Sequence, residues 1–140
     1  MPYPEDMVAP MRAEAVHAGA TEVRTAAQVK DALAGRKGTA LFFINSVCGC
    51  SAASARPGLG MALNKKPRPD HVYTAFAGND VEAVNEIRKV MVGFPPSSPS
   101  MALVKDGMLV AVIERHDVQG VTADALAAKL AGLFAEHCSA

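Results

Sequence analysis

Two hydrophobic patterns divide the chain into expected strands and helices. Continuous apolar runs, which are typical of strands covered on both faces, occur at residues 39–45 and 71–77. Residues 22–24 form a shorter strand candidate. Two further apolar runs, 100–104 and 108–113, flank an Asp-Gly turn, and this arrangement is a strong signal for a β-hairpin.

Apolar residues spaced three or four apart predict helices around these strands. The first lies between Pro4 and Gly19, with a boundary expected near Pro10 because proline is disfavoured inside a helix. The second covers residues 26–33, is capped by Thr25 and stops at Gly35. Three more helices are expected. One begins at about Cys50 and is bent in its second turn by Pro57. The next begins at Asp80, with the apolar face Val81, Val84, Ile87 and Met91, and the last begins at about Thr122, with one apolar face formed by Ala125, Leu126, Leu130, Leu133 and Phe134.

This order of elements predicts an α/β fold. Strands and helices alternate, and a hairpin and a closing helix follow, which implies a mixed central sheet with helices on both faces. The segment before the first strand adds an N-terminal helix. With 140 residues, the chain fits a single domain, residues 1–140, that buries roughly two-thirds of its unfolded surface. Such a domain needs no disulfide for stability.

Charge and composition exclude several partners. Basic and acidic residues are balanced at 14 each, so no overall field attracts nucleic acid or an anionic membrane. No segment approaches the ~20 apolar residues that a membrane helix requires. The N-terminus carries Glu5 and Asp6 where a signal peptide would carry bases. We therefore expect a cytoplasmic protein with neither nucleic-acid nor membrane partners.

The chemistry is expected at Cys48-Gly49-Cys50, directly after the most apolar strand. Cytoplasmic thiols are mostly free, so such a pair indicates catalysis or metal binding more than a structural bridge. At a strand-to-helix junction, the first N–H groups of the helix and its dipole stabilise a thiolate, which predicts a lowered pKa for Cys48. Gly49 lets the chain close a small disulfide ring, which we expect to be strained and easily reduced.

Two other interpretations of the pair stay open at this point. Both cysteines could be buried and inert, as free cysteines in cores often are. They could also bind zinc, although zinc usually takes four ligands and only His137 and Cys138 offer further soft donors. In that case the chain would be a binding or metal-carrying module without turnover.

Several short motifs extend over nearly the whole chain: Pro10-Met11-Arg12, Asn45-Ser46-Val47-Cys48-Gly49-Cys50, Ala55-Arg56-Pro57, Phe76-Ala77-Gly78, Pro96-Ser97-Ser98-Pro99-Ser100-Met101-Ala102-Leu103, Arg115-His116 and His137-Cys138. Together they resemble the bacilliredoxin family. The resemblance implies a thioredoxin-like fold and a bacterial cytoplasmic enzyme that removes bacillithiol from proteins to which it is disulfide-linked. A general disulfide oxidoreductase or isomerase is the second function that it suggests.

The resemblance also implies roles for particular residues. Cys48 would be the nucleophile and Cys50 the second active-site cysteine. Ser98, Pro99 and Ser100 would bind substrate, with Pro99 in a cis peptide bond as in thioredoxin-like proteins. Client proteins would be the partners and bacillithiol the thiol co-substrate, with no other cofactor and no metal.

Other residues receive less specific expectations. Arg56 could attract the carboxylates of the bacillithiol malyl group, with a solvated surface arginine as the alternative. Ser51 and Ala53 depart from the Ala and Gly expected after this motif, and Ser51 could hydrogen-bond a sulfur. We interpret Cys138 as a non-catalytic thiol rather than a resolving one, and His116 as a surface residue. The sequence does not determine the oligomeric state.

Overall fold

A five-stranded mixed sheet lies at the centre of the computed structural model, which describes residues 2–34 and 37–138. Its strand order is β1-β3-β2-β4-β5, with β1, β3 and β2 parallel and with β4 antiparallel to both β2 and β5. The elements are α1 (Glu5–Ala18), β1 (Thr21–Glu22), α2 (Ala26–Leu33), β2 (Thr39–Asn45), the π-helical turn η1 (Ser51–Ala55), α3 (Arg56–Leu63), β3 (His71–Phe76), α4 (Val81–Val90), β4 (Ser100–Lys105), β5 (Met108–Ile113), α5 (Arg115–Val118) and α6 (Ala123–His137).

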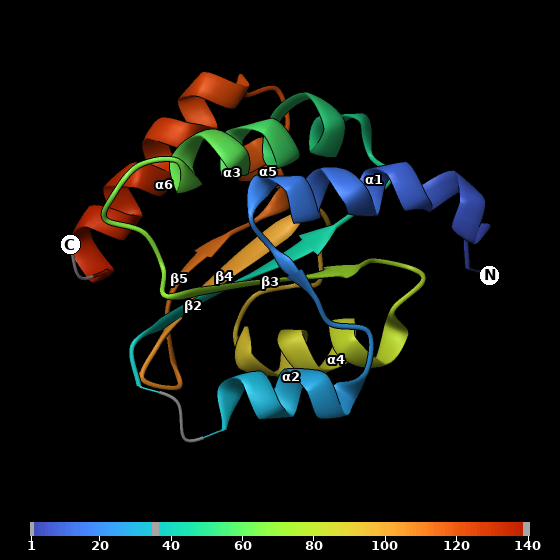
Figure 1. The fold of residues 1–140 in the computed structure, drawn as a ribbon, viewed down its shortest axis with the longest axis horizontal. Helices are drawn as coiled ribbons and strands as arrows, with labels where there is room; N and C mark the ends of the chain where they lie inside the picture. Colours follow the sequence, from blue (N-terminus) through green and yellow to red (C-terminus); the bar gives the residue numbers. More distant parts are fainter. Residues whose placement is uncertain (1, 35–36, 139–140) are drawn as a thin grey trace.

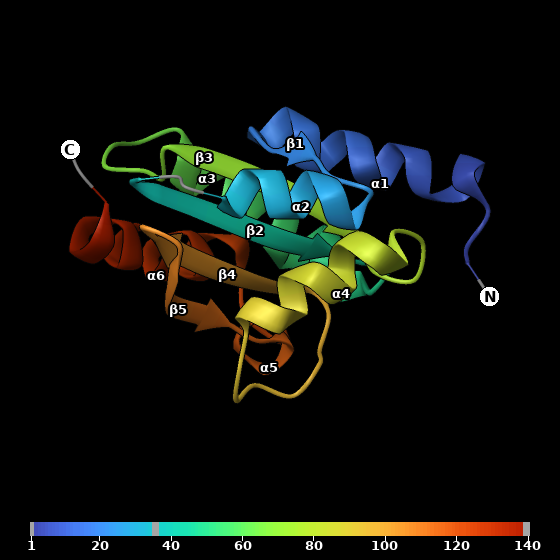
Figure 2. The ribbon, with the colours of Figure 1, turned by 90° about the horizontal axis from the view of Figure 1, so that it is seen from below.

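Helices cover both faces of this sheet. Figure 1 shows α1, α3, α5 and α6 on one side and α2 with α4 on the other, and Figure 2 shows the second side from below. The predicted α/β class, mixed sheet and added N-terminal helix are therefore confirmed. Among the described residues, no helix has the length and apolar character needed to cross a bilayer.

The central strand β2 explains why its sequence is apolar without interruption. All 7 of its residues are buried, and successive side chains enter different cores. Leu41 and Phe43 pack with the cluster under α3 and α6, whereas Phe42 and Ile44 pack with the cluster over α2 and α4. A strand with two hydrophobic faces directs its carboxyl end, Asn45, to the edge where the cysteines follow.

The hairpin and the predicted cap of α2 are confirmed. In the turn between β4 and β5, Asp106 and Gly107 have φ angles of 52° and 82°, the left-handed pair that two-residue hairpins favour. Thr25 accepts a hydrogen bond from the main chain of Gln28 at the start of α2, and Thr122 accepts one from Ala125 in α6. The predicted stop of α2 at Gly35 falls outside the described residues.

Two expectations about the helices are wrong. Helix α1 continues through Pro10 instead of ending near it. Its buried face, which includes Arg12, is held by contacts with other elements, and these offset the hydrogen bond that proline cannot make. Val81 is 55% exposed and Ala125 is also exposed, so neither belongs to the buried face of its helix. That face consists of Ala83, Val84 and Ile87 in α4 and of Leu126, Leu130 and Phe134 in α6. The bend expected at Pro57 stays a prediction: Pro57 lies in the first turn of α3, directly after the π-helical turn η1.

Candidate active site

The two candidate cysteines follow β2 at the point where its chain turns into η1. Cys48 and Cys50 are free, half-buried thiols whose Sγ atoms lie 2.7 Å apart and are hydrogen-bonded. The main-chain N–H of Ser51 donates to the carbonyl oxygen of Cys48 at 2.9 Å, which closes the turn. The structure therefore brings the two predicted cysteines together at a strand-to-helix junction.

The two sulfurs have different surroundings. Cys48 lines an open cleft of about 380 Å³, whereas Cys50 packs against the hydrophobic core beneath α3 and α6. The residues that line the cleft are Tyr3, Ser46, Val47, Cys48, Ala77, Gly78, Ser98 and Arg115. A substrate disulfide that enters this cleft meets Cys48 first.

Their acidities differ in the same sense. The pKa of the Cys48 thiol is lowered, chiefly by the hydrogen bond from Cys50 and further by the main-chain N–H groups of Cys50 and Ser51 and the positive charge of Arg115. The pKa of the Cys50 thiol is raised by its burial and by its proton's interaction with Cys48. Cys48 is therefore the more acidic thiol of the pair, and the neighbouring thiol contributes more to its lowered pKa than the helix start that the sequence suggested.

A buried amide holds the cysteine loop in place. The Oδ1 atom of Asn45 accepts hydrogen bonds from the Ser46 main chain, the Ser51 hydroxyl and the Arg56 guanidinium at 2.9, 3.0 and 2.9 Å. Its Nδ2 atom donates to the carbonyl oxygen of Met11 in α1 at 3.0 Å. One side chain therefore connects the end of β2, the turn η1 and the N-terminal helix.

This network corrects two expectations. The Ser51 hydroxyl is fully buried and donates to Asn45, so it does not bond a sulfur. Arg56 is only 4% exposed and is neither a substrate contact nor a solvated surface residue. Its guanidinium donates to Asn45, to the carbonyl oxygen of Ser46 at 3.1 Å and to Glu14 at 3.0 Å. These acceptors compensate the cost of burying its charge.

The Ser98-Pro99-Ser100 segment is only partly available to a substrate. The peptide bond between Ser98 and Pro99 is cis, as the resemblance implied. Ser98 lines the cleft beside Cys48, but Pro99 is buried. Ser100 is fully buried in β4 and its hydroxyl donates to the carbonyl oxygen of Ser97 at 2.9 Å, so its side chain cannot bind a substrate.

Sequence reasoning missed two residues of the cleft. Tyr3 forms a wall because its main chain exchanges two hydrogen bonds, of 2.9 and 3.0 Å, with the Asn79 side chain. Its ring lies against Gly78, whose φ of +90° suits glycine. Arg115 reaches the cleft from the first turn of α5, a short helix that the hydrophobic pattern did not predict. The only available signal was that Arg115-His116 belongs to the resemblance motifs.

The second pair of soft donors is too distant to join this site. Cys138 lies near Thr39, Asp70 and Lys105, beside the start of β2, and its pKa is raised by burial. Cys48 follows the other end of β2, and 7 residues of strand span roughly 20 Å at about 3.3 Å per residue. Cys138 therefore cannot resolve a disulfide on Cys48 in the same molecule, and a zinc site that joins the two groups is excluded.

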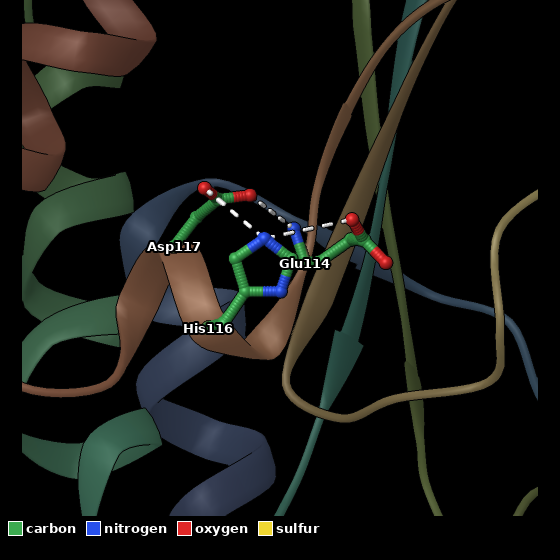
Figure 3. Close-up of side chains that lie close together, drawn as sticks. All are labelled: Glu114, His116 and Asp117. Atoms are coloured by element: carbon green, nitrogen blue, oxygen red, sulfur yellow. Dashed lines mark hydrogen bonds and ion pairs between the residues drawn. The ribbon is translucent and has the colours of Figure 1, made fainter.

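A third cluster lies on α5, close to the cleft. His116 Nε2 is 3.7 Å from both Glu114 Oε2 and Asp117 Oδ1, as Figure 3 shows. The two acids already cap α5, each accepting a main-chain N–H of the other, and Asp117 also accepts from Lys129 at 3.2 Å. They serve to fix the turn that carries Arg115.

The chain has relatives that match it over nearly its whole length. A family model described as disulphide isomerase matches residues 3–138. A bacilliredoxin of Geobacillus kaustophilus is 50% identical over 137 residues, which cover 98% of this chain and 94% of the relative. A bacilliredoxin of Cytophaga hutchinsonii is 47% identical over 134 residues, which cover 96% and 98%.

The chain belongs to the bacilliredoxin family. It is a thiol–disulfide oxidoreductase.

Solved structures support the fold of this bacilliredoxin. The thioredoxin-like domain of Arabidopsis NCP superposes with a TM-score of 0.59 at 15% identity and covers 86% of this chain and 79% of that one. Thioredoxin O2 from Arabidopsis thaliana in the oxidized state gives a TM-score of 0.54 at 19% identity, with 84% and 96% covered. The fold is therefore thioredoxin-like, as the resemblance implied.

Proposed function

We propose that this bacilliredoxin reduces mixed disulfides between bacillithiol and proteins, with Cys48 as the nucleophile and Cys50 as the second thiol. One observation carries the assignment of roles: Cys48 faces the cleft and its pKa is lowered, while Cys50 packs against the core and its pKa is raised. The reaction belongs in a compartment that keeps small thiols reduced, which is the cytoplasm.

The first step transfers the small thiol from the protein to the enzyme. The Cys48 thiolate attacks the bacillithiol sulfur of the mixed disulfide, a Cys48–bacillithiol disulfide forms, and the client cysteine leaves as a thiolate that takes a proton from water. No net oxidation occurs, because one disulfide is exchanged for another. Ser98 would flank the entering disulfide, since it lines the same cleft.

Two routes can release the adduct. A second bacillithiol thiolate can attack the adduct, which gives oxidised bacillithiol and a reduced enzyme. Alternatively, the Cys50 thiolate can attack Cys48, which releases bacillithiol and leaves a Cys48–Cys50 disulfide that a further dithiol must reduce. Cys50 lies within reach for the second route, since the two sulfurs are 2.7 Å apart. The first route needs no reductant other than bacillithiol.

The test uses a client protein that carries bacillithiol on one cysteine, with mass spectrometry of the client over time. Wild type should release the client thiol. Cys50→Ser should retain at least part of this rate when bacillithiol is supplied, and Cys48→Ser should retain none. Equal rates for Cys48→Ser and wild type would contradict the assignment of the nucleophile.

A general disulfide reductase or isomerase is the second candidate, which the description of the matching family model favours. The two functions differ in substrate, so the same variants should be assayed on a protein with scrambled disulfides. Faster turnover of scrambled protein than of the bacillithiol adduct would favour isomerisation. We expect slow turnover of scrambled protein. Two cysteines separated by one residue close a strained disulfide ring, which makes the pair a poor reductant of protein disulfides.

A further inference from the structure

Arg115 differs from the other arginines that the structure describes. Arg12, Arg24 and Arg56 pair with carboxylates, and Arg68 and Arg88 donate to carbonyl oxygens. The exposed guanidinium of Arg115 has no hydrogen bond or ion pair with any residue in the described part of the chain. Its full donor set is therefore available to a ligand.

The backbone at Arg115 is nevertheless fixed. Its main-chain N–H donates to the Ser97 hydroxyl at 3.3 Å, next to the segment that carries Ser98. The adjacent acids Glu114 and Asp117 cap the same short helix, and Asp117 also accepts from Lys129 (Figure 3). These acids engage the α5 main chain, His116 and Lys129, so they form no ion pair with the guanidinium of Arg115.

The cleft itself has a simple charge pattern. Of the described residues that line it, Arg115 carries the only permanent charge, and the group that reacts there is the Cys48 thiolate. The positive charge of Arg115 acts to lower the pKa of both thiols, which agrees with its place in the lining of the same cleft as Cys48. At about 380 Å³, the cleft has the size of a small-molecule site rather than of a protein interface.

We infer that Arg115 binds a carboxylate of the small thiol that enters the Cys48 cleft, so that the enzyme favours mixed disulfides whose non-protein half is acidic. The inference rests on the proposed function and adds the part of the substrate that is recognised. A planar guanidinium suits this task because it can donate two parallel hydrogen bonds to one carboxylate. Arg115 takes the role that the sequence suggested for Arg56, which is buried and whose Nε and Nη1 atoms donate to Glu14, Asn45 and Ser46.

The experiment compares two mixed disulfides of one cysteine-containing peptide. In the first the small thiol is mercaptopropionate, which carries a carboxylate, and in the second it is mercaptoethanol, which is neutral. The rate of peptide release is measured for wild type, Arg115→Gln, Arg115→Lys and Lys65→Gln. Lys65 is a matched control for charge, because it is exposed, has no side-chain partner among the described residues and lies in the loop between α3 and β3, at the other end of the sheet (Figure 1).

The decisive quantity is the rate on the acidic disulfide divided by the rate on the neutral one. Any change in Cys48 acidity affects both rates and cancels in this ratio. Arg115→Gln should lower the ratio about fivefold, which corresponds to about 1 kcal/mol at about 1.4 kcal/mol per factor of ten. Arg115→Lys should restore part of the ratio, and Lys65→Gln should leave it as in wild type.

The possible failures are distinguishable. An unchanged ratio in Arg115→Gln, or an equal fall in Lys65→Gln, would overturn the carboxylate site and leave the exchange chemistry of Cys48 intact. A wild-type enzyme that releases neither peptide, or a Cys48→Ser variant as active as wild type, would overturn the proposed function and this inference with it. Circular dichroism melts of each variant would show that the fold is retained.

Discussion

Replacing Arg56 by methionine should destabilise the protein without changing which substrate it prefers. The guanidinium donates to Asn45 and to the Ser46 carbonyl oxygen inside the protein, and to a Glu14 carboxylate that is half exposed. The Glu14 contact is worth little because water screens it, and Glu14 can rehydrate when it is lost. The stability effect therefore comes mainly from the two buried hydrogen bonds.

The magnitude follows from what the substitution leaves behind. Two charge-assisted hydrogen bonds contribute roughly 1.5 to 3 kcal/mol each, but methionine fills most of the volume and removes the cost of burying a charge. Asn45 Oδ1 keeps two of its three donors, so it is not left without a partner. We expect a net loss of about 2 kcal/mol, or a melting temperature lower by about 8 °C for a chain of this size.

The assay combines stability with kinetics. Urea unfolding followed by circular dichroism gives the free energy of unfolding of wild type, Arg56→Met and Arg56→Lys, and lysine should recover part of the loss because it can reach only one of the acceptors. Kinetics at a temperature where all three are folded should give the same ratio of acidic to neutral disulfide rates as wild type. An Arg56→Met variant with wild-type stability and a selective loss on the acidic disulfide would refute this assignment of Arg56.

Two further predictions concern thiol acidity and the cleft wall. Because the Cys50 thiol lowers the pKa of Cys48, the alkylation rate of Cys48 should rise with pH through a midpoint below that of free cysteine. Cys50→Ala should move this midpoint to higher pH. Cys50→Ser should move it less, because serine keeps a hydrogen-bond donor. A midpoint in Cys50→Ala at or below that of wild type would show that the Cys50 thiol is not the cause of the lowered pKa. Gly78→Ala should destabilise the protein by about 1 kcal/mol or more in urea unfolding, because φ is +90° and the new Cβ would lie 3.1 Å from the Tyr3 ring. Gly132→Ala in α6, where a new Cβ has no described neighbour within 4 Å outside its own helix, should stabilise the protein by up to about 1 kcal/mol. If both Gly78→Ala and Gly132→Ala destabilise the protein, the effect of Gly78→Ala does not come from its φ angle and the Tyr3 contact.

Much of the fold could be predicted because local patterns and tertiary structure agree. The run at β2, the Asp-Gly hairpin and the cap at Thr25 each carry their own structural reason. The continuation of α1 through Pro10 could not be predicted in this way. It depends on Arg12, whose guanidinium donates twice to Asp80 from 68 residues away, and no local pattern reports such a contact.

The site shows the same division between local and distant effects. The cysteine pair and the cis Ser98–Pro99 bond lie within motifs that can be recognised in the sequence. The roles of the arginines cannot be recognised in this way. The burial of Arg56 depends on Glu14, which is 42 residues away, and on Asn45 in another element. Closeness to the cysteines in the sequence therefore did not indicate which arginine lines the cleft, because Arg56 is buried and Arg115 reaches the cleft from α5.

The part played by Tyr3 has a practical consequence for handling the protein. Its main chain is fastened to Asn79, and its ring forms one wall of the cleft into which Cys48 opens. An affinity tag or fusion partner attached at the amino terminus would therefore begin two residues from that wall, and could alter exchange rates without affecting the melting temperature. Helix α6 ends at His137 near the opposite end of the sheet, so the carboxyl terminus is the better place for such an attachment (Figure 1).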